Sequence, residues 1–331
     1  MSLEPEQSQP NPASHANDEP SSRTGRLLRW ILPFVVSAVL LGWILSGMDL
    51  AALVDRLTPR AALIFVPTLM VFLLTTLIIE AVCLVWVVSY YHDFSSWMLA
   101  ARVKAASYLL GLINYALGAG AVTLLLRRRA GVPLSQAAGS VLLIALFDMG
   151  SLVLITLVAL GLHESEASML RTGSVALGAL ALLGSFALLR APIPLGPIDR
   201  LRDWKVLQAA RTLPIGLLIR LGVLRLAAVG SFIVLTGATL RSFNVDIPLA
   251  PLIVSICILL VISAIPMAAA GLGTGQVAFV ALFEGYAEPE TLLAASLTLS
   301  FGLIVTRAAI GLLFAREFTA EAFDARREIA P

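Results

Sequence analysis

The sequence predicts an all-α polytopic membrane protein with about six full transmembrane helices and two re-entrant or broken helical hairpins arranged as an inverted repeat. Three observations lead to this prediction. The 331 residues are 59% hydrophobic and only 13% charged, which is far from the composition of a soluble globular protein. Long apolar runs alternate with short polar loops along the chain. Two further apolar segments are broken in their middles by glycine, proline and small polar residues.

The uninterrupted apolar runs are each long enough to cross a hydrocarbon core of ~30 Å. They cover residues 27–46, 61–89, 140–162, 171–190, 214–240 and 291–315. Residues 1–22 have almost nothing to bury and should form a disordered tail. We expect 23–316 to be a single integral membrane domain and 317–331 a cytoplasmic tail. No loop is long enough for a separate soluble catalytic domain.

Loop charges orient these runs, because Arg and Lys collect on the cytoplasmic side of a membrane protein. Arg23 and Arg26 precede the first run and place the N-terminus in the cytoplasm. Arg316, Arg326 and Arg327 follow the last run and place the C-terminus there too. We expect a multi-pass protein of the bacterial inner (plasma) membrane.

The first broken segment contains Asn114, Gly118 and Gly120. A full crossing by 105–126 would put the basic run 127–129 outside the cell, against the charge rule. A half-helix that turns between Asn114 and Gly120 and returns keeps these arginines in the cytoplasm. The sequence therefore predicts a hairpin that enters and leaves on the inner side.

The second broken segment, roughly 248–286, contains Pro266, Gly271, Gly273 and Gln276. Both of its ends fall on the outer side. It is either a re-entrant hairpin or one full helix followed by a short return, and both arrangements keep the same topology.

These assignments give the order span, span, hairpin, span twice, in halves 27–162 and 171–315 of opposite orientation. Non-helical backbone in a bilayer survives only where protein or a wet cavity surrounds it. A matched pair of broken segments therefore indicates a transport site.

Five ionisable residues lie inside the predicted spans, where charges are costly and usually face a cavity or a partner. They are Glu80, Asp148, Arg220, Arg225 and Arg307. All five fall within roughly 9 to 17 Å of the cytoplasmic helix ends at a rise of 1.5 Å per residue. The three arginines outnumber the two carboxylates, which predicts a net-positive pocket with one guanidinium free to bind phosphate. The alternative is a set of structural ion pairs, or arginines that snorkel to the interface.

Neither the cysteines nor the histidines form a recognisable metal motif. Cys83 and Cys257 lie in apolar spans, and His15, His92 and His163 stand alone. We expect no metal, no cofactor and no nucleic-acid partner. We also expect no enzymatic activity, because Glu80 and Asp148 lie on different helices without a nucleophile nearby.

Two short patterns resemble the lysylphosphatidylglycerol synthase transmembrane region family, also described as flippase-like (UPF0104) membrane proteins. The first pattern comprises Asn114, the Gly118 to Gly120 break, Arg127 to Arg129, Gly131-Val-Pro-Leu-Ser135 and Asp148. The second comprises Ile265-Pro266 and Gly271-Leu-Gly273. The resemblance covers most of 27–315. It implies translocation of a lipid or a lipid-linked substrate, without the cytosolic aminoacyl-transfer domain of longer synthases.

We therefore expect a translocase that binds a phospholipid or polyprenyl-linked amphiphile and moves its headgroup between leaflets. The expected substrate-binding residues are Glu80, Asn114, Gly118, Gly120, Asp148, Arg220, Arg225, Pro266, Gly271, Gly273, Gln276 and Arg307. One alternative is a noncatalytic partner of a lipid-modifying enzyme that docks through the basic loop 190–211. Another alternative is a small-molecule permease.

Overall fold

The computed structural model describes most of the membrane domain that the sequence predicts. It covers residues 58–113, 115–161, 173, 176–180, 184, 207–264 and 274–329. The predicted tail 1–22, the predicted span 27–46 and most of the predicted span 171–190 lie outside the described residues.

Four of the described helices are long and apolar enough to cross a membrane. They are α3 (Pro59–Val88), α6 (Leu134–Gly161), α10 (Ile215–Ser242) and α13 (Pro289–Ile329). Local sequence signals set their ends: Thr58 caps α3 by accepting a hydrogen bond from the Ala61 amide at 3.2 Å. These helices confirm the all-α membrane fold and match four of the predicted spans.

The first broken segment forms a helical hairpin of α4 (Trp97–Ile113) and α5 (Tyr115–Ala130). Each helix is only about 25 Å long at 1.5 Å per residue, which is less than the ~30 Å core. The chain reverses so sharply that a Cβ on Gly118 would lie 2.9 Å from the Gly111 Cα. The sequence predicts a turn that extends from residue 114 to Gly120. This prediction is wrong in its extent, because Gly118 and Gly120 lie within α5. Glycine serves close helix packing here and not an unwound backbone.

The second broken segment contains α11 (Leu249–Ala264) and α12 (Thr274–Phe283), which pack against each other. The Ser255 hydroxyl on α11 donates a hydrogen bond to the Leu282 carbonyl on α12 at 3.3 Å. The predicted turn at 266–273 lies outside the described residues. Both helices are shorter than a full crossing.

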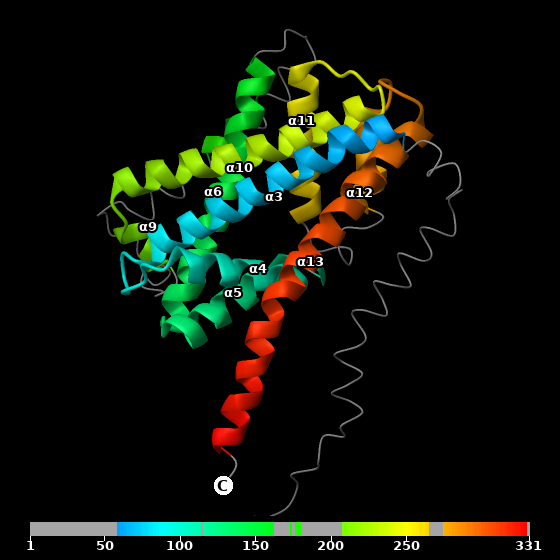
Figure 1. The fold of residues 1–331 in the computed structure, drawn as a ribbon. Helices are drawn as coiled ribbons and strands as arrows, with labels where there is room; N and C mark the ends of the chain where they lie inside the picture. Colours follow the sequence, from blue (N-terminus) through cyan, green and yellow to red (C-terminus); the bar gives the residue numbers. More distant parts are fainter. Residues whose placement is uncertain are drawn as a thin grey trace, which may run out of the picture.

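Helices α3 and α10 lie side by side across the middle of the molecule (Figure 1). Phe72 and Phe232 join them in an edge-to-face contact with ring centroids 5.7 Å apart. The helices around this pair pack in two matching sets, in which α4, α5 and α6 of the first half correspond to α11, α12 and α13 of the second. Helix α6 packs on α11 and α13 packs on α4. Within each half, α5 packs on α6 and α12 packs on α13. An internal repeat, in which each half packs in the same way, would produce these matching contacts. The opposite membrane orientation of the two halves stays a prediction.

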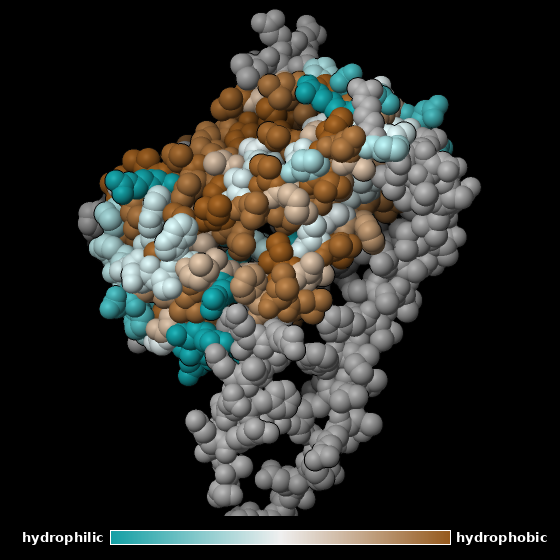
Figure 2. All heavy atoms as spheres, viewed as in Figure 1, coloured by the Kyte–Doolittle hydropathy of each residue, from teal (hydrophilic) through white to brown (hydrophobic). Residues whose placement is uncertain are grey.

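The helices present apolar side chains to the outside. Leu63, Val277 and Leu313 are 75%, 71% and 72% exposed. In the face drawn in Figure 2, hydrophobic residues cover the middle, and hydrophilic residues gather toward two ends. This pattern suits a protein whose middle faces lipid tails. The short helix α9 (Gln208–Thr212) lies directly before α10.

The predicted inverted orientation can be tested with two exposed positions, Arg128 at the end of α5 and Glu284 after α12. We expect a cysteine at 128 to react with a membrane-impermeant maleimide only from the cytoplasmic side. A cysteine at 284 should react only from the opposite side. The measurement uses intact cells and inverted vesicles, with the native Cys83 and Cys257 replaced by serine. Labelling of both positions from one side would contradict the predicted topology.

Candidate functional site

Five helices each contribute one ionisable side chain to what we term the charged cluster. Its members are Glu80 on α3, Lys104 on α4, Asp148 on α6, Arg225 on α10 and Arg307 on α13. All five lie inside apolar helices, where an isolated charge would be costly. The helices converge so that the charges act on one another.

Arg225 is the most deeply buried member, at 3% exposed. Its Nη1 donates to Oδ1 of Asp148 at 3.3 Å, and the Cys83 thiol lies beside the same guanidinium. Its Nε and Nη2 are buried and have no hydrogen-bond partner within the described part of the chain. A buried donor without a partner costs about 1–3 kcal/mol, and more when it is charged. Within the described part of the chain, no hydrogen bond offsets the burial cost of these two donors.

Glu80 is held by two side chains of α4. Its Oε1 lies 3.3 Å from Nζ of Lys104, and its Oε2 accepts a hydrogen bond of 2.8 Å from the hydroxyl of Tyr108. Lys104 and Tyr108 are four residues apart and therefore share one face of their helix. Both oxygens of the Glu80 carboxylate thus have partners on α4.

Arg307 lies over the ring of Tyr108, with its Cζ 5.8 Å from the ring centroid, which is within cation–π range. Among the described residues, no carboxylate lies within ion-pair distance of its guanidinium. Its charge still acts on Glu80 across the cluster.

The cluster combines three cations and two carboxylates, which leaves one net positive charge. The sequence predicts a net-positive pocket with Arg220 as its third cation, but Lys104 stands in that place. The side chain of Asp148 is 27% exposed and that of Glu80 is 19% exposed. The cluster therefore reaches the surface of the described residues.

The first hairpin lies next to the charged cluster. Tyr115, the first residue of α5, is within electrostatic reach of Asp148, Glu80 and Arg225. Gly118 is buried one turn further along, whereas Gly120 is exposed, and a methyl group there would meet nothing within 4 Å among the described residues. The hairpin and the buried arginine thus belong to one region.

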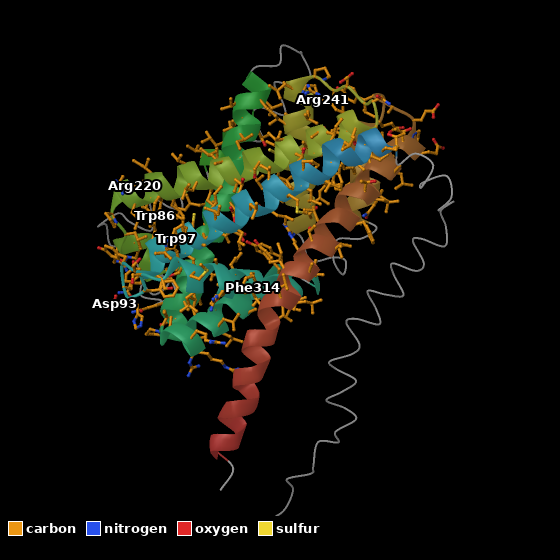
Figure 3. All side chains as sticks on the ribbon, in the orientation of Figure 1. Trp86, Asp93, Trp97, Arg220, Arg241 and Phe314 are labelled. Atoms are coloured by element: carbon orange, nitrogen blue, oxygen red, sulfur yellow. The ribbon has the colours of Figure 1, made fainter. Side chains whose placement is uncertain are left out.

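The structure does not bring every predicted site residue to the cluster. Arg220 is exposed near the α9 end of α10 (Figure 3). Gln276 on α12 is 3% exposed, and its Nε2 donates to the Ser300 hydroxyl on α13 at 3.1 Å. Asn114, Pro266, Gly271 and Gly273 lie outside the described residues.

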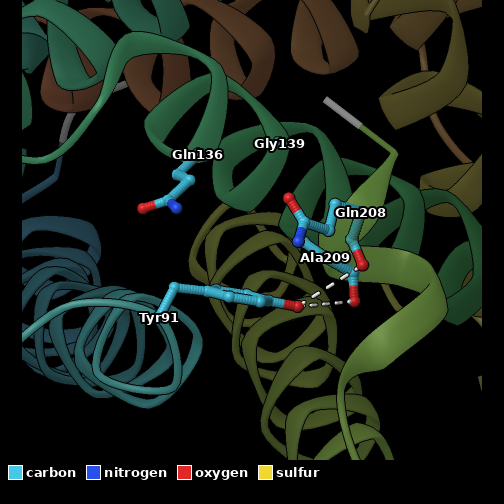
Figure 4. Close-up of a pocket in the computed structure, with 5 residues that line it drawn as sticks. All are labelled: Tyr91, Gln136, Gly139, Gln208 and Ala209. Carbon is cyan, nitrogen blue, oxygen red and sulfur yellow. Dashed lines mark hydrogen bonds between the residues drawn. The ribbon is translucent and has the colours of Figure 1, made fainter. Parts of the chain in front are cut away.

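A separate small pocket lies between three parts of the chain: the turn after α3, the first turns of α6, and α9 (Figure 4). The Tyr91 hydroxyl donates to the carbonyls of Gln208 and Ala209, both at 3.4 Å, and Gln136 and Gly139 complete the lining. The five lining residues are uncharged. We interpret the pocket as packing between α9 and the core.

Sequence reasoning missed Lys104 and Tyr108. Lys104 follows the predicted span 61–89, so the charge rule alone would count it as a loop cation on the cytoplasmic side, but α4 begins seven residues earlier. The spacing of the two residues, one helical turn inside an apolar segment, is the signal that could have found them. Among the described residues, no group of three or more His, Cys, Asp or Glu side chains could hold a metal ion.

Comparison with known families gives one match. Residues 30–311 match the family model described as the lysylphosphatidylglycerol synthase TM region. No curated protein and no solved structure matches the chain. The matched range contains all five members of the charged cluster and all four long helices up to residue 311 of α13.

Proposed function

This chain belongs to the lysylphosphatidylglycerol synthase transmembrane region family, and from that premise we propose that it moves a lipid or a lipid-linked amphiphile between the leaflets of a bacterial inner membrane. In this proposal the chain is not itself an enzyme. Both of its ends lie in the cytoplasm. Movement is downhill or coupled to an ion.

The observation that carries the proposal is the unpaired edge of the buried Arg225 guanidinium. Its Nε and Nη2 lie side by side on one edge, an arrangement that suits two oxygens of a phosphate or carboxylate. Burial removes water from Nε and Nη2. A lipid anion would accept charge-assisted hydrogen bonds from both groups and so offset the cost of burying them. Arg307 would supply a second positive charge.

The surrounding structure supports a membrane-level binding site and not a surface one. The cluster lies within helices whose outer faces are apolar, so acyl or polyprenyl chains can stay in the bilayer while the headgroup enters the cluster. The described helices of the two broken segments are each shorter than a crossing and lie within opposite halves of the predicted repeat. We propose that rocking of one half against the other transfers the headgroup.

The direct test is lipid exchange in reconstituted vesicles. Vesicles that carry a trace of headgroup- or chain-labelled fluorescent phospholipid are treated with an impermeant quencher that reaches only the outer leaflet. We expect the full-length protein to let the quencher bleach inner-leaflet label, fastest for anionic phospholipids. Protein-free vesicles and vesicles containing an unrelated membrane protein are the controls. Bleaching that stays at the protein-free level for phospholipids and for a polyprenyl phosphate would refute the proposal.

A further inference from the structure

Tyr108 contacts two opposite charges of the cluster at once. Its hydroxyl donates to Oε2 of Glu80 at 2.8 Å, and its ring lies under the Arg307 guanidinium at 5.8 Å. The two contacts use different parts of one side chain. They join α3 and α13 through α4, which packs against both.

Glu80 is the carboxylate best placed to neutralise Arg307. Both groups contact the side chain of Tyr108: the hydroxyl donates to Oε2 of Glu80 at 2.8 Å, and the ring lies 5.8 Å from Cζ of Arg307. Opposite charges that share one neighbouring side chain inside a membrane domain attract each other, so an ion pair between them would compete with the contacts seen here. In the structure, the contacts from Lys104 and Tyr108 hold the Glu80 carboxylate instead.

Lys104 alone does not hold both oxygens of this carboxylate. It lies 3.3 Å from Oε1, while Oε2 has its hydrogen bond from Tyr108. Loss of the Tyr108 hydroxyl would leave Oε2 without that donor and free to rotate toward the cation above the ring. An internal carboxylate paired with Arg307 would then compete with any external anion.

We propose that Tyr108 is a positioning residue of the anion site: its hydroxyl fixes Glu80 on Lys104, and its ring supports Arg307, so that the Arg307 charge stays available to an anionic headgroup. This proposal rests on the proposed function. It assigns Glu80 the role of an internal competitor and not of a ligand to the substrate.

The test compares Tyr108→Phe, which keeps the ring, with Tyr108→Leu, which removes it. Binding of phosphatidylglycerol to the purified full-length protein is measured by native mass spectrometry, with phosphatidylcholine as the uncharged-headgroup reference. We expect Tyr108→Phe to weaken phosphatidylglycerol binding by about tenfold, the equivalent of one charge-assisted contact. Adding Glu80→Gln to Tyr108→Phe should restore binding to within about twofold of the original protein, because the competing charge is gone.

Rescue separates positioning from a merely structural role. Glu80→Gln should not rescue Tyr108→Leu, since Arg307 then lacks its support. Tyr90→Phe, at an exposed tyrosine outside the cluster, serves as the matched control and should bind as the original protein does. Unchanged binding in Tyr108→Phe, or a loss that Glu80→Gln does not restore, would overturn the proposal.

The same measurement keeps this proposal distinct from the proposed function. If the original protein shows no preference for phosphatidylglycerol and Arg225→Gln changes nothing, the anion site itself is wrong. If Arg225→Gln abolishes the preference while Tyr108→Phe leaves it intact, the anion site stands and only the role of Tyr108 fails. Thermal unfolding of each variant shows whether it is folded.

Discussion

Replacing Arg225 with glutamine should lower lipid exchange in reconstituted vesicles at least about a hundredfold, because two charge-assisted hydrogen bonds to the headgroup are lost at about 1.5–3 kcal/mol each. Glutamine is shorter than arginine, but it keeps a polar side chain and carries no charge. The change therefore removes the anion-binding edge and leaves an uncharged polar group in its place. The measurement is the rate of inner-leaflet bleaching with an anionic fluorescent phospholipid.

The single variant leaves Asp148 without its cation, and breaking a buried ion pair destabilises a protein by about 3–5 kcal/mol. A second variant separates function from folding. In Arg225→Gln with Asp148→Asn neither charge is left alone, so the fold should recover while lipid exchange stays low. Stability is followed by thermal unfolding of the purified protein in detergent.

Arg220→Gln is the matched control on the same helix. Arg220 is exposed and belongs to no ion pair within the described residues, so its replacement should change stability by no more than about 0.5 kcal/mol. Its lipid exchange should equal that of the original protein. Equal losses in Arg220→Gln and Arg225→Gln would mean that net charge and not the buried site controls exchange.

The contrast between these two arginines shows what the sequence could and could not predict. Counting residues along a helix gives the depth of a side chain, and depth selects five residues. The structure brings four of them together: Glu80, Asp148, Arg225 and Arg307. Counting does not give the direction in which a side chain points relative to its neighbours in space. Arg220 and Arg225 are five residues apart and differ by roughly 140° around the helix axis, so only one of them faces the cluster.

Lys104 shows a second limit of prediction from the sequence. Loop charges orient a chain only on the assumption that each charge lies outside a helix. Helix α4 begins at Trp97, so Lys104 lies about two turns inside it and pairs with Glu80. Hydropathy averages over a window and does not distinguish a loop cation from a cation inside a short hairpin helix.

The hairpins were predictable as breaks but not in their detail. Glycine and a polar residue in an apolar segment indicate that a straight crossing is interrupted, and α4 and α5 confirm this interruption. The same glycines also favour close approach of two helices, which leaves each of them helical. The sequence does not distinguish these two uses, and Gly118 serves the second.

The close approach of α4 and α5 at Gly118 predicts that alanine is tolerated on one side of the contact and not on the other. A Cβ on Gly118 would lie 2.9 Å from the Gly111 Cα and 3.2 Å from the Gly111 nitrogen, and both are backbone atoms that a side-chain rotation does not relieve. We expect Gly118→Ala to separate α4 from α5 at an overpacking cost of about 1–3 kcal/mol. Thermal unfolding should therefore begin at a lower temperature.

Two neighbouring glycines make the result specific to this contact. A Cβ on Gly111 would lie 3.9 Å from the Gly118 Cα, an ordinary contact, so Gly111→Ala should be tolerated although it lies at the same interface. Gly120 has no described neighbour within 4 Å, and alanine there should stabilise the helix by up to about 1 kcal/mol. Because α4 contributes Lys104 to the charged cluster, separation of the hairpin should also slow lipid exchange, and only in Gly118→Ala. Three alanine variants with the same stability would show that α4 and α5 are not packed through Gly118.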